Sequence, residues 1–102
     1  MSHTIRLRGF WEVVEAGEHA THSRHFGKPR LPDETERIWL VCSTLPAATQ
    51  VHLNGDLIAT NQVPGPFQAD ITIRLLGRNT VSFTVPRGEY PGEVALEIRR
   101  PS

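Results

Sequence analysis

The chain has 102 residues, and its 11 lysine and arginine side chains balance 11 aspartate and glutamate side chains, giving a formal net charge of zero. This length predicts one domain over residues 1–102 and excludes a barrel enzyme of about 250 residues, while the zero net charge argues against nucleic acid as a partner. The single cysteine excludes an intramolecular disulfide, and the lack of a long apolar run or signal peptide predicts a soluble, cytoplasmic domain without a membrane partner.

Alternating apolar and polar residues predict short strands in the first half of the chain. Residues 5–14 alternate except at Gly9, which is predicted to form a bulge within one strand. Residues 16–36 are too many for a simple loop, so a further strand is expected near residues 21–26. Residues 38–42 are apolar at every position, which predicts a strand covered on both faces or central in its sheet.

The second half of the chain begins with a hairpin signal. Asn54-Gly55 separates two alternating runs and predicts a type I′ turn, because both central residues of that turn need a positive φ. Residues 67–75, 81–85 and 94–98 alternate and predict half-buried strands. Since no long window shows a helical period, the pattern indicates a β-sandwich or a small barrel.

Several of these features follow one another in a characteristic order. The features are Arg24-His25-Phe26, Arg37-Ile38-Trp39-Leu40, Val51-His52-Leu53-Asn54-Gly55-Asp56-Leu57-Ile58, Pro66-Phe67, Asp70-Ile71-Thr72 and Leu76-Gly77-Arg78-Asn79-Thr80-Val81. Over residues 22–85 this order resembles the N-terminal jelly-roll, galactose-binding-like domain of glycoside hydrolase family 2 enzymes, the β-galactosidases and β-glucuronidases.

The resemblance implies an all-β, two-sheet jelly-roll β-sandwich with about eight strands. In the family enzymes catalysis belongs to a separate barrel domain, and the jelly roll is an accessory. The motif residues have structural roles in this interpretation. Asp70 is expected to accept backbone N–H groups where one strand passes to the next, and Asn79 tolerates the left-handed conformation after Gly77.

The alternation also predicts which side chains fill the space between the sheets. The predicted core is Ile5, Leu7, Val13, Ile38, Leu40, Val51, Leu53, Leu57, Phe67, Ile71, Ile73, Val81, Phe83, Val85, Leu96 and Ile98. Trp39 lies within the apolar run and is expected to pack in the core as well.

Aromatic side chains outside the apolar run are the candidates for binding sugars, whose apolar faces stack on flat rings. Trp11, Arg87 and Tyr90 form the candidate carbohydrate site. The alternative for Trp11 is core packing, and the alternative for Tyr90 is a ring that covers its own loop.

Three histidines, His19, His22 and His25, recur at every third residue and are the metal-ligand candidates. On a strand this spacing sends successive rings to opposite faces, so solvated histidines are favoured and no cofactor is predicted. Cys42 lies in the most apolar strand and no Gly-x-Ser-x-Gly motif is present, so no catalytic residue is predicted. Arg6 and Arg8 share a strand face and, together with Arg99-Arg100 at the far end, suggest a basic stripe for nucleic acid, but the zero net charge argues against it.

Two functions from different classes are therefore in question. The first is a non-catalytic binding module, with carbohydrate as the ligand implied by the resemblance alone. The alternative is a structural or protein-interaction domain that self-associates as a homo-oligomer, with residues 38–42 leaving one apolar face for a partner. A concave site lined by Trp11 or Tyr90 favours the first function, and an uncovered sheet face without such a site favours the second.

Overall fold

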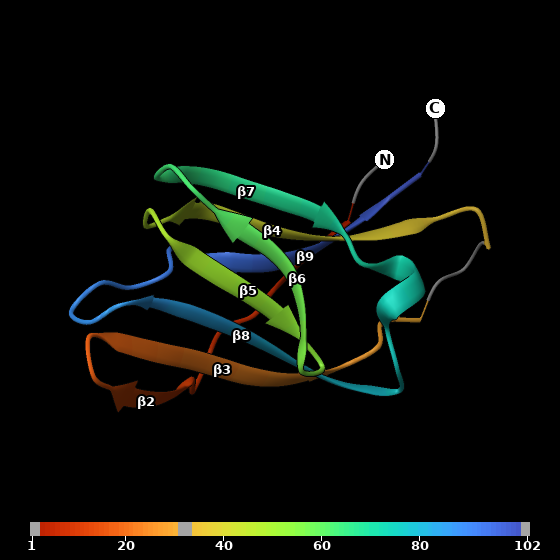
Figure 1. Cartoon of the computed structure of the whole chain (residues 1–102). Coiled ribbons are helices and arrows are strands. Elements are labelled where there is room, and N and C mark those ends of the chain that lie inside the picture. The colour runs from red at the N-terminus through yellow and green to blue at the C-terminus, as the bar shows by residue number, and fades with distance from the viewer. Residues whose placement is uncertain (1–2, 31–33, 101–102) are drawn as a thin grey trace.

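A computed structural model describes residues 3–30 and 34–100 of the chain. These residues form nine strands and one short 3-10 helix, with the strands in two antiparallel sheets packed face to face (Figure 1). The elements are β1 (His3–Arg6), β2 (Glu12–Ala16), β3 (His19–Gly27), β4 (Arg37–Leu45), β5 (Thr49–Leu53), β6 (Asp56–Asn61), β7 (Gly65–Asp70), η1 (Thr72–Arg74), β8 (Arg78–Pro86) and β9 (Val94–Arg99). The predicted jelly-roll β-sandwich is confirmed. No helix in this described part of the chain is long and apolar enough to cross a membrane.

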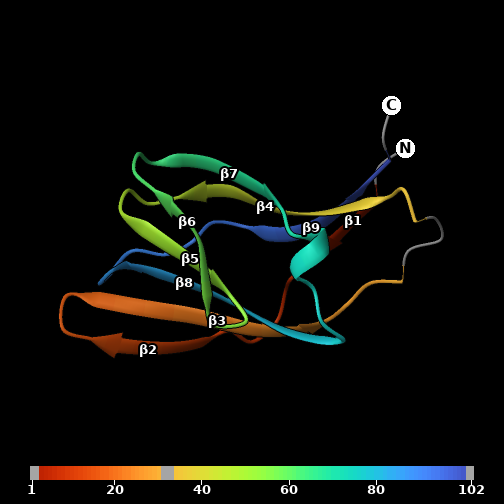
Figure 2. The same ribbon diagram turned by 45° about the vertical axis from the view of Figure 1, so that its right-hand side comes forward.

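The two sheets differ in size. One sheet has four strands in the order β1-β9-β4-β7, and the other has five strands in the order β2-β3-β8-β5-β6 (Figure 2). β4 lies between β9 and β7, which confirms the central position predicted for residues 38–42. β3 confirms the strand expected near residues 21–26.

The side chains of β4 alternate between the two faces of the four-stranded sheet. Ile38, Leu40 and Cys42 point into the core, whereas Trp39 and Val41 lie half-buried on the outer face. The prediction that Trp39 packs in the core was therefore wrong. An unbroken apolar run does not reveal that alternate residues face away from the opposing sheet, because it has no polar residue to mark the outer face.

The segment predicted as one bulged strand is in fact two strands in different sheets. β1 pairs with β9 and β2 pairs with β3, so the chain crosses between the layers from Leu7 to Trp11. Gly9 has a φ of 95° in this crossing, a conformation that glycine adopts without strain. The interruption of the alternation was real, but it marks a change of sheet rather than a bulge.

The core lies between the sheets. The prediction is confirmed for Leu7, Ile38, Leu40, Val51, Leu53, Ile71, Val81, Phe83, Val85, Leu96 and Ile98, and half-buried Ile5 and Phe67 pack against them. The core also contains Ala20, Phe26, Cys42, Leu45, Leu75 and Val94.

Three predicted core residues are exposed, each for a different reason. Val13 is 48% exposed because β2 is an edge strand. Leu57 is 53% exposed because a register shift pairs it with His52, on the outer face of its sheet. Ile73 is 85% exposed because it belongs to η1 rather than to a strand.

Asp70 ends β7 and turns the chain into η1, so the strand predicted over residues 67–75 was wrong beyond this point. Its Oδ1 accepts the Thr72 backbone N–H at 3.0 Å and the Thr72 hydroxyl at 2.6 Å, while Arg37 donates to Oδ2 at 2.8 Å. The predicted role of Asp70 as an acceptor of backbone N–H is thereby confirmed. Burial acts to raise the pKa of Asp70, but the hydrogen bonds from Arg37 and Thr72 outweigh it and hold the pKa below its usual value.

The two motif asparagines hold neighbouring loops together. Asn54 and Gly55 have φ values of 53° and 86°, which confirms the predicted turn with two positive φ angles. Asn79 is buried and does not have a positive φ, so the left-handed conformation that asparagine tolerates is not used there. Its Oδ1 instead accepts the Leu76 backbone N–H at 2.8 Å and the Asn54 side-chain amide at 3.0 Å.

Candidate functional site

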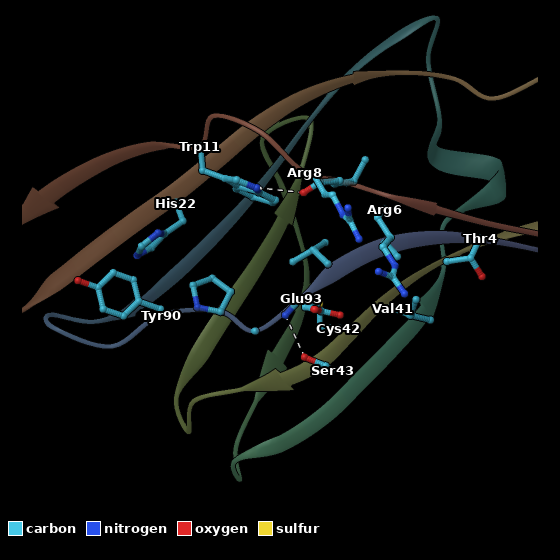
Figure 3. Close-up of a pocket in the computed structure, with 15 residues that line it drawn as sticks. Thr4, Arg6, Arg8, Trp11, His22, Val41, Cys42, Ser43, Tyr90 and Glu93 are labelled. Carbon is cyan, nitrogen blue, oxygen red and sulfur yellow. Dashed lines mark hydrogen bonds between the residues drawn. The ribbon is translucent and has the colours of Figure 1, made fainter.

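A pocket of about 630 Å³ opens at the side of the sandwich where β1 and β2 form the sheet edges. It is lined by residues from β1 and the crossing that follows it, from β3 and β4, and from the loop that leads into β9 (Figure 3). The lining side chains lie in a row, with Tyr90, His22 and Trp11 at one end and Thr4 and Val41 at the other (Figure 3). The pocket is therefore elongated, with an aromatic end and a polar end.

The ring of Trp11 has a defined orientation at the aromatic end. Its Nε1 donates to the Leu7 carbonyl at 3.2 Å, and its ring centre lies 6.0 Å from that of the core residue Phe83 at an interplanar angle of 44°. Because the indole N–H is already satisfied, the ring offers the pocket an apolar surface.

Tyr90 lies at the same end of the pocket, on an exposed loop, and contacts a buried histidine. Its ring is 71% exposed and meets His22 edge-on, with ring centres 5.5 Å apart. Burial lowers the pKa of His22, although a backbone hydrogen bond with Glu89 acts in the opposite direction. His22 therefore favours its neutral form and serves as a flat support for Tyr90.

Charged side chains line the middle and the far end of the pocket. Arg6 and Arg8 point toward the same part of the cavity, above Glu93 (Figure 3). None of the ion pairs within residues 3–30 and 34–100 involves these three side chains. They leave two guanidinium donors and one carboxylate acceptor available to a ligand.

The loop that carries Tyr90 is fastened to the end of β4. The Gly92 N–H donates to the Thr44 carbonyl at 2.8 Å, and the Glu93 N–H donates to the Ser43 hydroxyl at 2.9 Å. A Cβ at position 92 would lie 2.5 Å from the Ser43 Oγ and 2.9 Å from the Thr44 carbonyl oxygen. Only glycine allows the loop to approach β4 this closely.

The structure brings two of the three predicted ligand residues to the pocket. Trp11 and Tyr90 line it, whereas Arg87 does not. Arg87 donates from Nε and Nη2 to the two carboxylate oxygens of Glu15, each at 3.2 Å, and from Nη1 to the Gly17 carbonyl. The hydrogen bonds and charge of Arg87 lower the pKa of Glu15. Arg87 thus joins the end of β8 to the turn between β2 and β3, and it lies outside the candidate site.

The sequence interpretation missed His22, Glu93 and the two arginines as pocket residues. The shared spacing of Arg6 and Arg8 was a signal, but it was interpreted as a basic stripe. No pattern singles out Glu93, because its place depends on how the loop before β9 meets β4.

The three histidines of β3 do not converge. His22 points inward, while His19 and His25 are exposed on the opposite face, as expected for the two-residue period of a strand. Among the described residues no group of three His, Cys, Asp or Glu side chains could hold a metal ion. Cys42 borders the pocket from the core, and burial raises the pKa of its thiol to about 12.

No family model and no curated protein matches the chain. Solved β-glucuronidases are similar in structure. The FMN-binding enzyme from Facaelibacterium prausnitzii L2-6 has a TM-score of 0.82 and 19% identity over 98% of this chain and 23% of its own. For the Bifidobacterium dentium enzyme, complexed with coumarin-3-O-glucuronide, the TM-score is 0.80 at 15% identity, over 99% of this chain and 30% of that one. For the Dictyoglomus thermophilum enzyme the TM-score is 0.76 at 14% identity, over 97% of this chain and 28% of that one.

The chain spans less than a third of the length of each of these three enzymes. At these identities the likeness shows a shared fold, and it agrees with the resemblance to the jelly roll of glycoside hydrolase family 2 in the sequence. The chain thus has the fold of a sandwich domain that occurs within β-glucuronidases.

Proposed function

We propose that this domain is a non-catalytic carbohydrate-binding module whose site is the pocket between Trp11 and Tyr90. The observation that carries the proposal is a concave site with aromatic walls and unpaired charged groups. Its volume of about 630 Å³ lies in the usual range for small-ligand sites, about 300–1,000 Å³. The neighbours in structure are carbohydrate-active enzymes, and one of them was solved with a glucuronide, which supports a sugar as the ligand class.

The chemistry of the pocket suits a pyranose ring. The face of Trp11 and the ring of Tyr90 provide apolar surfaces for the C–H face of a sugar. The guanidinium groups of Arg6 and Arg8 donate hydrogen bonds to hydroxyl and ring oxygens, and the Glu93 carboxylate accepts them from hydroxyls. Because Trp11 is held by Leu7 and Phe83, little ordering of this wall accompanies binding.

The test is an amide-shift titration of labelled protein with monosaccharides and oligosaccharides. We expect the largest shifts at the Trp11 indole N–H, Tyr90 and Glu93. Tyr90→Ala should weaken binding by about 2–10-fold, since a stacking contact contributes about 0.5–1.5 kcal/mol. Leu57→Ala is the matched control, because Leu57 is also exposed but lies outside the pocket. If no sugar shifts a resonance at millimolar concentration, the proposal is wrong.

A second candidate function is self-association. It is favoured by the outer face of the four-stranded sheet, where Trp39 and Val41 are half-buried and no other element of the described chain forms a third layer. Sedimentation across a range of protein concentrations tests this candidate. A mass that rises with concentration for the wild type, and stays monomeric for Val41→Asp, supports it.

A further inference from the structure

We propose that the pocket continues as a groove across the outer face of the four-stranded sheet to Trp39, so that the domain binds an extended neutral glycan rather than a single sugar. This inference rests on the proposed function and deepens it. It adds Trp39 as a second stacking platform and Arg99 as the side chain that covers this platform in the free protein.

The pocket already reaches the outer face of this sheet. Arg6, Ala95 and Val41, from three neighbouring strands, all line it. Cross-strand pairing places these three in one row over the outer face, because Arg6 pairs with Ala95 and Ala95 pairs with Val41. Trp39 lies two residues from Val41 on the same face of β4, a separation of about 7 Å along a strand. The platform therefore adjoins the polar end of the pocket.

One face of the Trp39 ring is occupied by an arginine. The Arg99 Cζ lies 4.5 Å from the ring centre of Trp39. Its Nε donates to the Glu97 carboxylate at 2.7 Å, and its Nη2 donates to the Gln68 side-chain carbonyl at 2.7 Å. A guanidinium in this position stacks on the ring where the C–H face of a sugar would stack.

Arg99 can leave this position at small cost. Its side chain is 31% exposed, and water weakens the ion pair, the hydrogen bond to Gln68 and the cation–π contact of such a side chain. Once Arg99 moves, the Glu97 and Gln68 oxygens lose their donor and become acceptors for sugar hydroxyls. A displaceable side chain thus keeps the ring covered until a ligand long enough to reach it is bound.

The charges around Trp39 favour a neutral ligand, whereas Arg6, farther along the same face, is in none of the ion pairs of the described residues. Arg99 is paired with Glu97, and Arg37 is paired with Asp70 at 2.8 Å on the same sheet. Paired charges of both signs provide donors and acceptors side by side but no field that would attract a polymer of one sign. A chain of hydroxyl-bearing sugar units matches such a surface.

The test compares ligands of increasing length. Isothermal titration calorimetry would use neutral cello-, xylo-, manno- and malto-oligosaccharides from the monosaccharide to the hexasaccharide. We expect the affinity of the protein for these oligosaccharides to rise with the length of the ligand. Trp39→Ala should reduce the affinity for the longest ligand about 2–10-fold and leave that for the shortest ligands unchanged, as expected for the loss of one stacking contact.

Arg99→Ala should act in the opposite direction. Removing the side chain that covers the platform should raise the affinity for the longest ligand and leave that for short ligands unchanged. Arg74→Ala is the matched control, since Arg74 is exposed on η1 and lies outside the pocket. Because the Arg99 side chain is partly exposed on the outer face of the sheet, we expect Arg99→Ala to fold. This variant therefore tests the inference even if Trp39→Ala does not fold.

A fluorescence measurement provides an independent signal. The chain has two tryptophans, so Trp11→Phe leaves Trp39 as the only indole, and its emission should change with long ligands but not with short ones. Affinity that does not depend on ligand length, or weaker binding in Arg99→Ala, overturns the inference and leaves the proposed function standing. If no ligand binds, both fail. A dimer that dissociates in Trp39→Ala overturns the inference in favour of self-association.

Discussion

The sandwich has an open side, where β1 and β2 are edge strands and the pocket lies, and a closed side around β5 and β8. One row of side chains on the inner face of the five-stranded sheet runs from the closed side to the open side. Val51, Phe83, His22 and Val13 are paired in this order across β5, β8, β3 and β2. Their exposed fractions are 0%, 0%, 5% and 48%. All four point the same way from the same sheet, but only the first three are covered, and the ring that meets His22 belongs to Tyr90 of the loop before β9.

The difference teaches that direction and cover are separate properties of a strand residue. Alternation determines which face a side chain points from. Whether that face is covered depends on how far the opposing sheet extends. The candidate site lies on the open side, where Trp11 and Tyr90 stand beside the core without being enclosed by it.

The largest expected effect is on the free energy of unfolding, when a phenylalanine is replaced by alanine on the closed side and, for comparison, on the open side of the sandwich. Phe83→Ala should lower the free energy of unfolding by about 3–5 kcal/mol, because it leaves a cavity among fully buried neighbours. Phe10→Ala should change it by less than about 0.5 kcal/mol, since Phe10 is 86% exposed. Urea unfolding followed by circular dichroism measures both. A comparable loss for Phe10→Ala would break the comparison and show that a partner covers the open side.

An intermediate effect is expected where the open side is fastened to the core. Gly92→Ala should destabilise the fold by about 1–3 kcal/mol, because its Cβ would meet the Thr44 backbone at 2.9 Å. Gly77→Ala is the matched control, as a Cβ there meets nothing within 4 Å. Urea unfolding measures the stability of both variants. A neutral Gly92→Ala variant would show that the Tyr90 loop does not depend on this close approach.

The smallest expected effect is a pH dependence at the boundary between the two sides. Burial lowers the pKa of His22, so the unfolded chain binds a proton more readily than the folded protein. Stability should therefore fall as the pH decreases through about 6.5, the ordinary value for histidine. Thermal melts at about pH 7.5 and about pH 5 measure the change in Tm. His22→Phe keeps a ring beside Tyr90 and should show a smaller change, while an equal change would exclude His22 as the source.

The fold was predictable because its determinants are local. The positive φ angles at Asn54-Gly55, the acceptor role of Asp70 and the two-residue periods of β8 and β9 each depend on a few neighbouring residues. The strand predicted past Asp70 failed for a local reason as well. The Asp70–Thr72 hydrogen bonds form a turn that competes with the strand, and residues 67–75 keep their alternation through it.

The candidate site was predictable only in part. Trp11 and Tyr90 could be singled out as aromatic residues outside the most apolar run. Arg87 could not be separated from Arg6 and Arg8, because their places depend on contacts between residues far apart in the chain. The Arg87–Glu15 ion pair and the Glu93–Ser43 hydrogen bond both join distant segments.

The amino-acid sequence by itself determined that this chain forms a β-sandwich, where most of its strands lie and which side chains alternate toward the core. Only the tertiary structure decided that residues 5–14 split between two sheets, that Trp39 faces outward and that Trp11, Tyr90, Arg6 and Glu93 share one pocket. Strand period and turn geometry arise from neighbouring residues, whereas cover and convergence arise from how far the two sheets extend over one another.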